Sequence, residues 1–144
     1  MLLNKIKFTS RRVAGLLVLF LAISCFYSSV QAASYTVETV PNAHLSDRSN
    51  RVSNPDGIIL PEDVATINQM LQLVEDSLSI EVAVVAIESI GDNDARMFAT
   101  DLFKHWGIGK KGEDNGLLIL LVTDPAQRAV VFETGYGIEG ILPD

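Results

Sequence analysis

Two patterns of apolar residues follow each other between residues 61 and 87, and each predicts an element. Apolar side chains recur every three or four residues over 61–78, which predicts an amphipathic helix. Pro61, Glu62 and Asp63 suit its first turn, because proline fits the first helical position and acids complement the helix dipole. The run 80–87 is almost wholly apolar after Glu81 and rich in β-branched residues, which predicts a strand buried on both faces.

A second helix and two more strands follow. Phe98, Leu102 and Trp106 share one face of a helix over 95–106, and Gly107 can end it in the left-handed conformation. The run 117–122 predicts another strand buried on both faces, and 129–132 predicts a third strand that returns antiparallel to it. The unit 80–122 should form a right-handed parallel pair.

Alternating helices and strands predict an α/β fold with a mixed, mainly parallel sheet. Two helices give thin cover for two strands that are buried on both faces. We therefore expect the natural domain to continue past Asp144.

The first 32 residues have the pattern of a secretory signal peptide. Residues 1–12 are basic without acids, residues 13–23 are apolar, and Val30 and Ala32 are small residues at a cleavage site after Ala32. The apolar run is shorter than a bilayer span needs. Two alternatives stay open: an uncleaved anchor, and lipidation at Cys25. We expect an exported protein, periplasmic or extracellular, with membrane tethering open, an extended lead-in over 33–53 and a folded domain over 54–144.

Charge and composition exclude several functions. The net charge is −7, and cleavage after Ala32 removes four basic residues and no acids, so the mature chain carries 7 − 18 = −11. Such an acidic chain argues against binding to nucleic acids, which requires clustered Lys and Arg. The single cysteine excludes a disulfide framework and a cysteine-rich zinc site.

The motifs favour carboxylate chemistry over nucleotide chemistry. Residues 107–112 match G-x-G-x-x-G, but they follow a helix and precede a strand, the reverse of the dinucleotide-binding context, so we expect no nucleotide. Oxygen-bearing side chains in loops suit a hard cation, with Ca²⁺ preferred to Mg²⁺, although acids in loops are commonly just solvated. The candidate ligands are Asp56, Asp114, Asn115 and Glu139.

Four segments resemble the TPM domain family, which includes YgcG-like bacterial proteins and thylakoid-lumen proteins linked to photosystem II repair. They are NPDGIIL with the following P-E, VAVVAI, LFKHWGIGKKGEDNGLLILL and ETGYGIEGILPD. The resemblance implies a three-layer α/β/α sandwich, divalent-cation binding in some members and acid-phosphatase-like activity in the plant branch. By motif, Asp114 and Asn115 match the family's D-N pair, Glu139 its glutamate and Asp144 its closing aspartate. The family often has an acid where Asn54 stands, and here the nearby acid is Asp56.

Three hypotheses for function follow. The first is an extracytoplasmic interaction or scaffold module that binds one divalent cation between Asp114 and Glu139. The second is a metal-assisted acid phosphatase acting on phosphomonoesters, with Asp144 as general acid or base. The third is an interaction domain that docks a membrane or membrane-protein partner through Trp106 and the glycine-rich loop.

Overall fold

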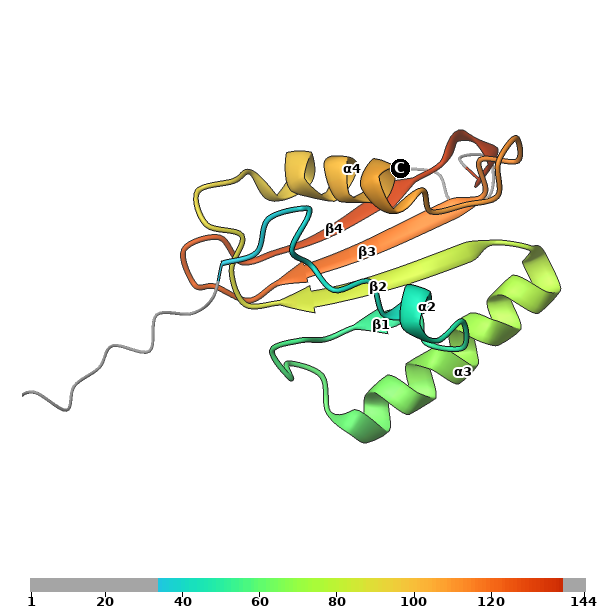
Figure 1. Cartoon of the computed structure of the whole chain (residues 1–144), viewed down its shortest axis with the longest axis horizontal. Helices are drawn as coiled ribbons and strands as arrows, with labels where there is room; N and C mark the ends of the chain where they lie inside the picture. The colour runs from blue at the N-terminus through green and yellow to red at the C-terminus, as the bar shows by residue number, and fades with distance from the viewer. Residues whose placement is uncertain (1–33, 139–144) are drawn as a thin grey trace, which may run out of the picture. The chain divides into compact units, whose positions relative to one another are not determined.

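A computed structural model describes residues 34–138 of the chain. Its sheet has the strand order β1-β2-β3-β4, in which β1, β2 and β3 are parallel and β4 is antiparallel to β3 (Figure 1). This confirms the mixed, mainly parallel sheet of an α/β fold. The elements are α2 (Ala43–Ser46), β1 (Val52–Ser53), α3 (Pro61–Leu78), β2 (Glu81–Ile87), α4 (Ala95–Trp106), β3 (Gly116–Val122), β4 (Ala129–Thr134) and the short 3₁₀ helix η1 (Tyr136–Ile138).

The two long helices begin and end where the sequence predicts. Helix α3 starts at Pro61, and Leu60 before it makes no side-chain cap. In α4, the Asp94 carboxylate accepts hydrogen bonds from the backbone N–H groups of Arg96 and Met97, both at 3.0 Å. Gly107 ends α4 with a φ of 64°, the left-handed conformation that glycine adopts without strain.

Helices α3 and α4 cover opposite faces of the sheet. Leu71 and Val74 of α3 pack on the face that carries Val82 and Leu117. Phe98 and Leu102 of α4 pack on the other face, which carries Val85, Leu118 and Leu120. Helix α3 connects β1 to β2, and α4 connects β2 to β3, so both connections move one strand in the same direction across the sheet. Because the two helices lie on opposite faces, the two connections have opposite handedness. One of them is the uncommon left-handed form.

The two faces differ in how far they are covered. Strand β2 is buried on both faces, as predicted, but β3 alternates between buried and half-buried positions, so its predicted burial on both faces is wrong. The reason is that α3 contacts β1 and β2 and leaves the rest of its face uncovered. We call the uncovered part the open face; its residues are Leu117, Ile119, Leu121, Val130 and Phe132.

Residues 34–53, predicted as an extended lead-in, pack against the sheet. Ser34 forms a bridge with Ser89, and Val40 is buried in the core beside α4. The Ser53 hydroxyl, in β1, donates to the carbonyl of Pro41. Apolar residues in this segment are too few to produce a periodic pattern, so their burial depends on the sheet beneath them.

The predicted signal peptide, residues 1–32, lies outside the described residues. Within 34–138, none of the helices combines the length and apolar character needed to cross a bilayer.

Candidate functional site

Two glycine-rich loops meet where β2 and β3 begin. The first joins α4 to β3, and the second follows β4. The backbone N–H of Gly137 donates to the carbonyl of Asp114 at 3.0 Å. A Cβ on Gly135 would lie 2.1 Å from that same oxygen, and a Cβ on Gly137 would lie 2.0 Å from the carbonyl oxygen of Glu113. The two backbones therefore touch only because both positions are glycine. We call this contact the loop junction.

Asn115 holds the first loop in place. Its side-chain amide donates to the Ser79 carbonyl and, at 2.9 Å, to a carboxylate oxygen of Glu113. Its side-chain oxygen accepts from the backbone N–H of Lys110 at 2.7 Å. Asn115 is only 7% exposed, and both ends of its amide are hydrogen-bonded within the protein. Asn115 was predicted as a cation ligand, but its hydrogen bonds fix the shape of the loop.

Asp114 is presented by an unusual backbone conformation. Its φ is 49°, which makes it one of two non-glycine residues with positive φ in the described part of the chain. The side chain is exposed and lines a cleft of about 530 Å³. Because residues of α4 and of the edge strand β4 line it as well, the cleft runs along the open edge of the sheet. Its lining residues are Arg96, Phe103, Ile108, Asp114, Phe132, Glu133, Thr134, Gly135 and Tyr136.

Three polar residues of this cleft were missed by the sequence analysis: Arg96, Glu133 and Tyr136. Glu133 accepts a hydrogen bond from the Thr100 hydroxyl at 3.0 Å, which links β4 to α4. Arg51–Glu75 is the single ion pair within residues 34–138, so no described carboxylate pairs with Arg96. Tyr136 is 83% exposed. Arg96 and Tyr136 lie on elements 40 positions apart in the chain, and no sequence motif connects them.

Asp56 lies at the other end of the sheet. Its carboxylate accepts from the Tyr35 hydroxyl at 2.8 Å and from the backbone N–H of Glu88, just after β2, at 2.7 Å. Asp114 lies beside the start of β2, where the N–H of Glu81 donates to the carbonyl of Asn115. A strand the length of β2 spans about 20 Å. The structure therefore does not bring Asp56 and Asp114 to one ion.

The contact with Asp56 also changes the pKa of Tyr35. Burial, and then the hydrogen bond and charge of Asp56, raise the pKa of Tyr35 above its ordinary value. Asn54, where the family often has an acid, is used differently: its amide donates to the carbonyl of Ile59 at 2.8 Å and accepts from the N–H of Ile59 at 3.1 Å. Asn54 closes the turn between β1 and α3, and an acid could not make the first of these bonds.

The remaining predicted site residues, Glu139 and Asp144, lie outside the described residues. Within 34–138, no three His, Cys, Asp or Glu side chains come together closely enough to hold a metal ion. The described part of the loop junction thus offers two exposed carboxylates, Asp114 and Glu113, and Glu113 accepts a hydrogen bond from Asn115. A third carboxylate for a cation there would come from beyond Ile138.

One of the comparisons with known proteins names a family. The family model described as the TPM domain matches residues 52–144. A solution NMR structure of the N-terminal domain of a protein from P. gingivalis is 40% identical, with a TM-score of 0.70, over 78% of this chain and 70% of that one. No curated protein matches the chain. The family match covers more than half of the sequence, and we conclude that the chain belongs to the TPM domain family.

Proposed function

We propose that this TPM domain is an exported interaction or scaffold module that binds one divalent cation at the loop junction. Asp114 and Glu139 would be the acidic ligands. The observation that supports this most is the hydrogen bond from Gly137 to the carbonyl of Asp114, because Glu139 follows Gly137 by only two positions. Export rests on the sequence pattern of residues 1–32.

Repulsion between the two proposed acidic ligands, Asp114 and Glu139, favours the binding of a cation. Two carboxylates held close together repel each other, and this repulsion favours protonation of one of them. A bound cation removes the repulsion and stabilises the folded state by mass action. Ca²⁺ suits a site of irregular geometry, because it accepts carboxylates, backbone carbonyls and water in variable numbers. Asn115 would contribute by holding the loop rather than by binding the ion.

Thermal unfolding of the full chain tests the cation site. Melting temperatures are compared in CaCl₂, MgCl₂ and NaCl of equal ionic strength, and in a chelator. A ligand at a hundredfold excess over its Kd adds about 2.7 kcal/mol of stability. We therefore expect Ca²⁺ to raise the Tm by on the order of 10 °C. Asp114→Asn and Glu139→Gln should abolish the shift, while the matched control Asp101→Asn, exposed on α4, should keep it. Equal melting temperatures in CaCl₂ and NaCl would remove the proposal.

A second candidate, phosphomonoester hydrolysis, is favoured by one observation. Arg96, near the start of α4, lines the same cleft as Asp114 and would supply a positive charge that draws a phosphate ester into the cleft of an acidic protein. A cation held by Asp114 and Glu139 would supply activated water, Arg96 would attract the anionic ester into the cleft, and Asp144 would transfer a proton.

An aryl phosphate assay in Ca²⁺ or Mg²⁺ tests this second candidate. We expect hydrolysis by the full chain and a loss of at least tenfold in kcat/KM in Asp114→Asn and in Arg96→Met. The exposed residue Lys104, also on α4, provides the control Lys104→Met, which should keep its rate. Rates equal to those of the metal salt alone would leave only the interaction module.

A further inference from the structure

The open face is an apolar surface that lacks a covering element among the described residues. Val130 is 59% exposed and Phe132 is 61% exposed, whereas Leu117, Ile119 and Leu121 beside them are half-buried. On one side this face is bounded by α3, and on the other by the free edge of β4 (Figure 1). Two strands about 4.8 Å apart give a width of about 10 Å, which suits one additional segment of chain.

The chain leaves the described region within this same face. Ile138 is 1% exposed and packs with Ile80 and Val82, and Leu117 and Ile119 of the open face pack against the same cluster. Ile138, the last described residue, therefore lies beside the uncovered apolar surface rather than in solvent.

The residues after Ile138 match the surface in chemistry and spacing. Ile141 and Leu142 come three and four positions after Ile138, so the three side chains share one face in a helical turn. Helix η1 already ends at Ile138, and Pro143 would end a further turn. Even fully extended, the four residues from Ile138 to Leu142 reach only about 13 Å. Phe132 is within that range, because it pairs across the sheet with Ile119, a neighbour of Ile138.

We propose that the segment 139–144 docks on the open face and places Ile141 and Leu142 against Phe132 and Val130. The segment would supply part of the third layer, on the side of the sheet that α3 leaves uncovered. The proposal does not depend on the cation, because neither Asp114 nor the Glu139 carboxylate takes part in the apolar contact.

Disulfide trapping in the full chain tests the docking directly. In a Cys25→Ser background, Phe132→Cys is combined with Ile141→Cys or with Leu142→Cys, and the protein is oxidised. Glu133→Cys gives the matched control, because residue 133 is the next position on β4 and points to the α4 face. A disulfide needs Cβ atoms about 4 Å apart. We expect the yield of intrachain disulfide to be at least tenfold higher with residue 132 than with residue 133, as measured by mass spectrometry of non-reduced peptides.

Every other result overturns the proposal. Equal trapping at 132 and 133 would mean that the segment has no fixed place, and the absence of trapping would mean that it lies elsewhere. Bonds at 132 only between two chains would assign the face to a second copy. A variant without new cysteines gives an independent check: Ile141→Ser with Leu142→Ser should raise binding of a dye for apolar surfaces several-fold. Pro143→Ser, which keeps the apolar pair, should leave dye binding unchanged.

Discussion

At the scale of single residues, the loop junction depends on positions where no other side chain fits. Gly135 and Gly137 let one loop contact the carbonyl groups of the other. Asn115 bonds two groups within the first loop and the Ser79 carbonyl at the end of α3. The sequence marks both loops as glycine-rich, and this local signal suffices to predict tight turns. It does not show that the two loops touch, because the contact joins residues more than twenty positions apart.

Alanine at Gly135 or at Gly112 compares two effects of an added side chain: a clash with a neighbouring backbone and strain from a positive φ. Gly135→Ala would place a Cβ 2.1 Å from the Asp114 carbonyl oxygen, a clash with backbone. We expect a loss of at least about 2 kcal/mol in the free energy of unfolding, measured by urea denaturation. Gly112→Ala is the matched control, because it meets no atom within 4 Å and only its φ of 89° opposes a side chain. It should cost about 1 kcal/mol. Equal losses would contradict a steric role for Gly135.

From the raised pKa of Tyr35, we expect the stability of the protein to fall at alkaline pH. The pKa of Tyr35 is raised by burial and by Asp56, so the native state favours the protonated hydroxyl. This contribution is complete below the ordinary tyrosine pKa of about 10 and is lost as pH rises through the raised value. Between pH 7 and about pH 10.5, the urea midpoint of unfolding should therefore fall more for the wild type than for Tyr35→Phe. A parallel fall in both proteins would show that this hydroxyl does not contribute.

At the scale of elements, the short strand β1 is held by side chains rather than by its own length. It has two residues, and just before it the buried Arg51 side chain pairs with Glu75 of α3. The Arg51 backbone N–H donates to the side chain of Asn68, also on α3, at 2.7 Å. The apolar pattern predicts α3 correctly, but β1 is too short to give a pattern and was not predicted. Its stability comes from α3 and β2, which lie on either side.

Removal of the Glu75 carboxylate should loosen this edge. Glu75→Gln leaves the Arg51 guanidinium, whose side chain is 5% exposed, without its only described ion-pair partner. Because Glu75 is 27% exposed, we expect a loss of about 2 kcal/mol, below that for a fully buried pair. Asp76→Asn, next along α3 and exposed, should change stability by less than about 0.5 kcal/mol. Chemical denaturation of both variants measures the difference, and equal stabilities would show that the pair is not stabilising.

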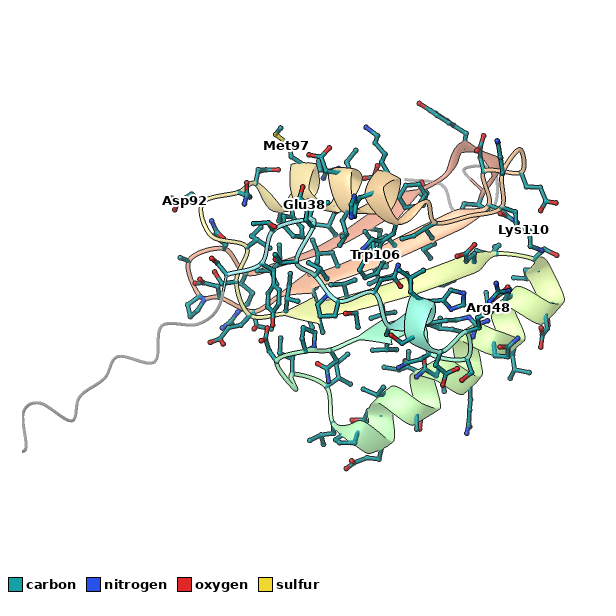
Figure 2. All side chains as sticks on the ribbon, in the orientation of Figure 1. Glu38, Arg48, Asp92, Met97, Trp106 and Lys110 are labelled. Atoms are coloured by element: carbon teal, nitrogen blue, oxygen red, sulfur yellow. The ribbon has the colours of Figure 1, made fainter. Side chains whose placement is uncertain are left out.

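At the scale of the whole domain, the side chains on the two faces of the sheet determine what each face can do. The face toward α4 is closed by α4 and by residues 34–42, including Val40, whereas α3 covers only part of the other (Figure 2). Trp106 packs against the closed face, so the hypothesis that it docks a partner gains no support from its position. The asymmetry explains why β2 is buried on both sides and β3 only on one.

Amide hydrogen exchange should reflect this arrangement. Gly135 donates to the carbonyl of Gly116, so alternation along the ladder directs the N–H groups of Val131 and Glu133 toward β3. Those of Val130 and Phe132 then face the free edge. We expect slow exchange for the first pair and for β2, and exchange at least tenfold faster for the second pair, measured by NMR. Uniform protection along β4 would show that another strand pairs with this edge.

The sequence alone determined the α/β class, the bounds of α4, the antiparallel return of β4 and the membership of a recognisable family. These follow from periodicity, capping and short motifs, which act between residues close together in the chain. Tertiary structure decided that residues 34–53 pack on the sheet, that Asp56 lies at the far end from Asp114, and that Arg96 joins Asp114 in one cleft. Such placements depend on which strands pair and on which face each helix packs, and those choices are made by contacts between residues far apart in the chain.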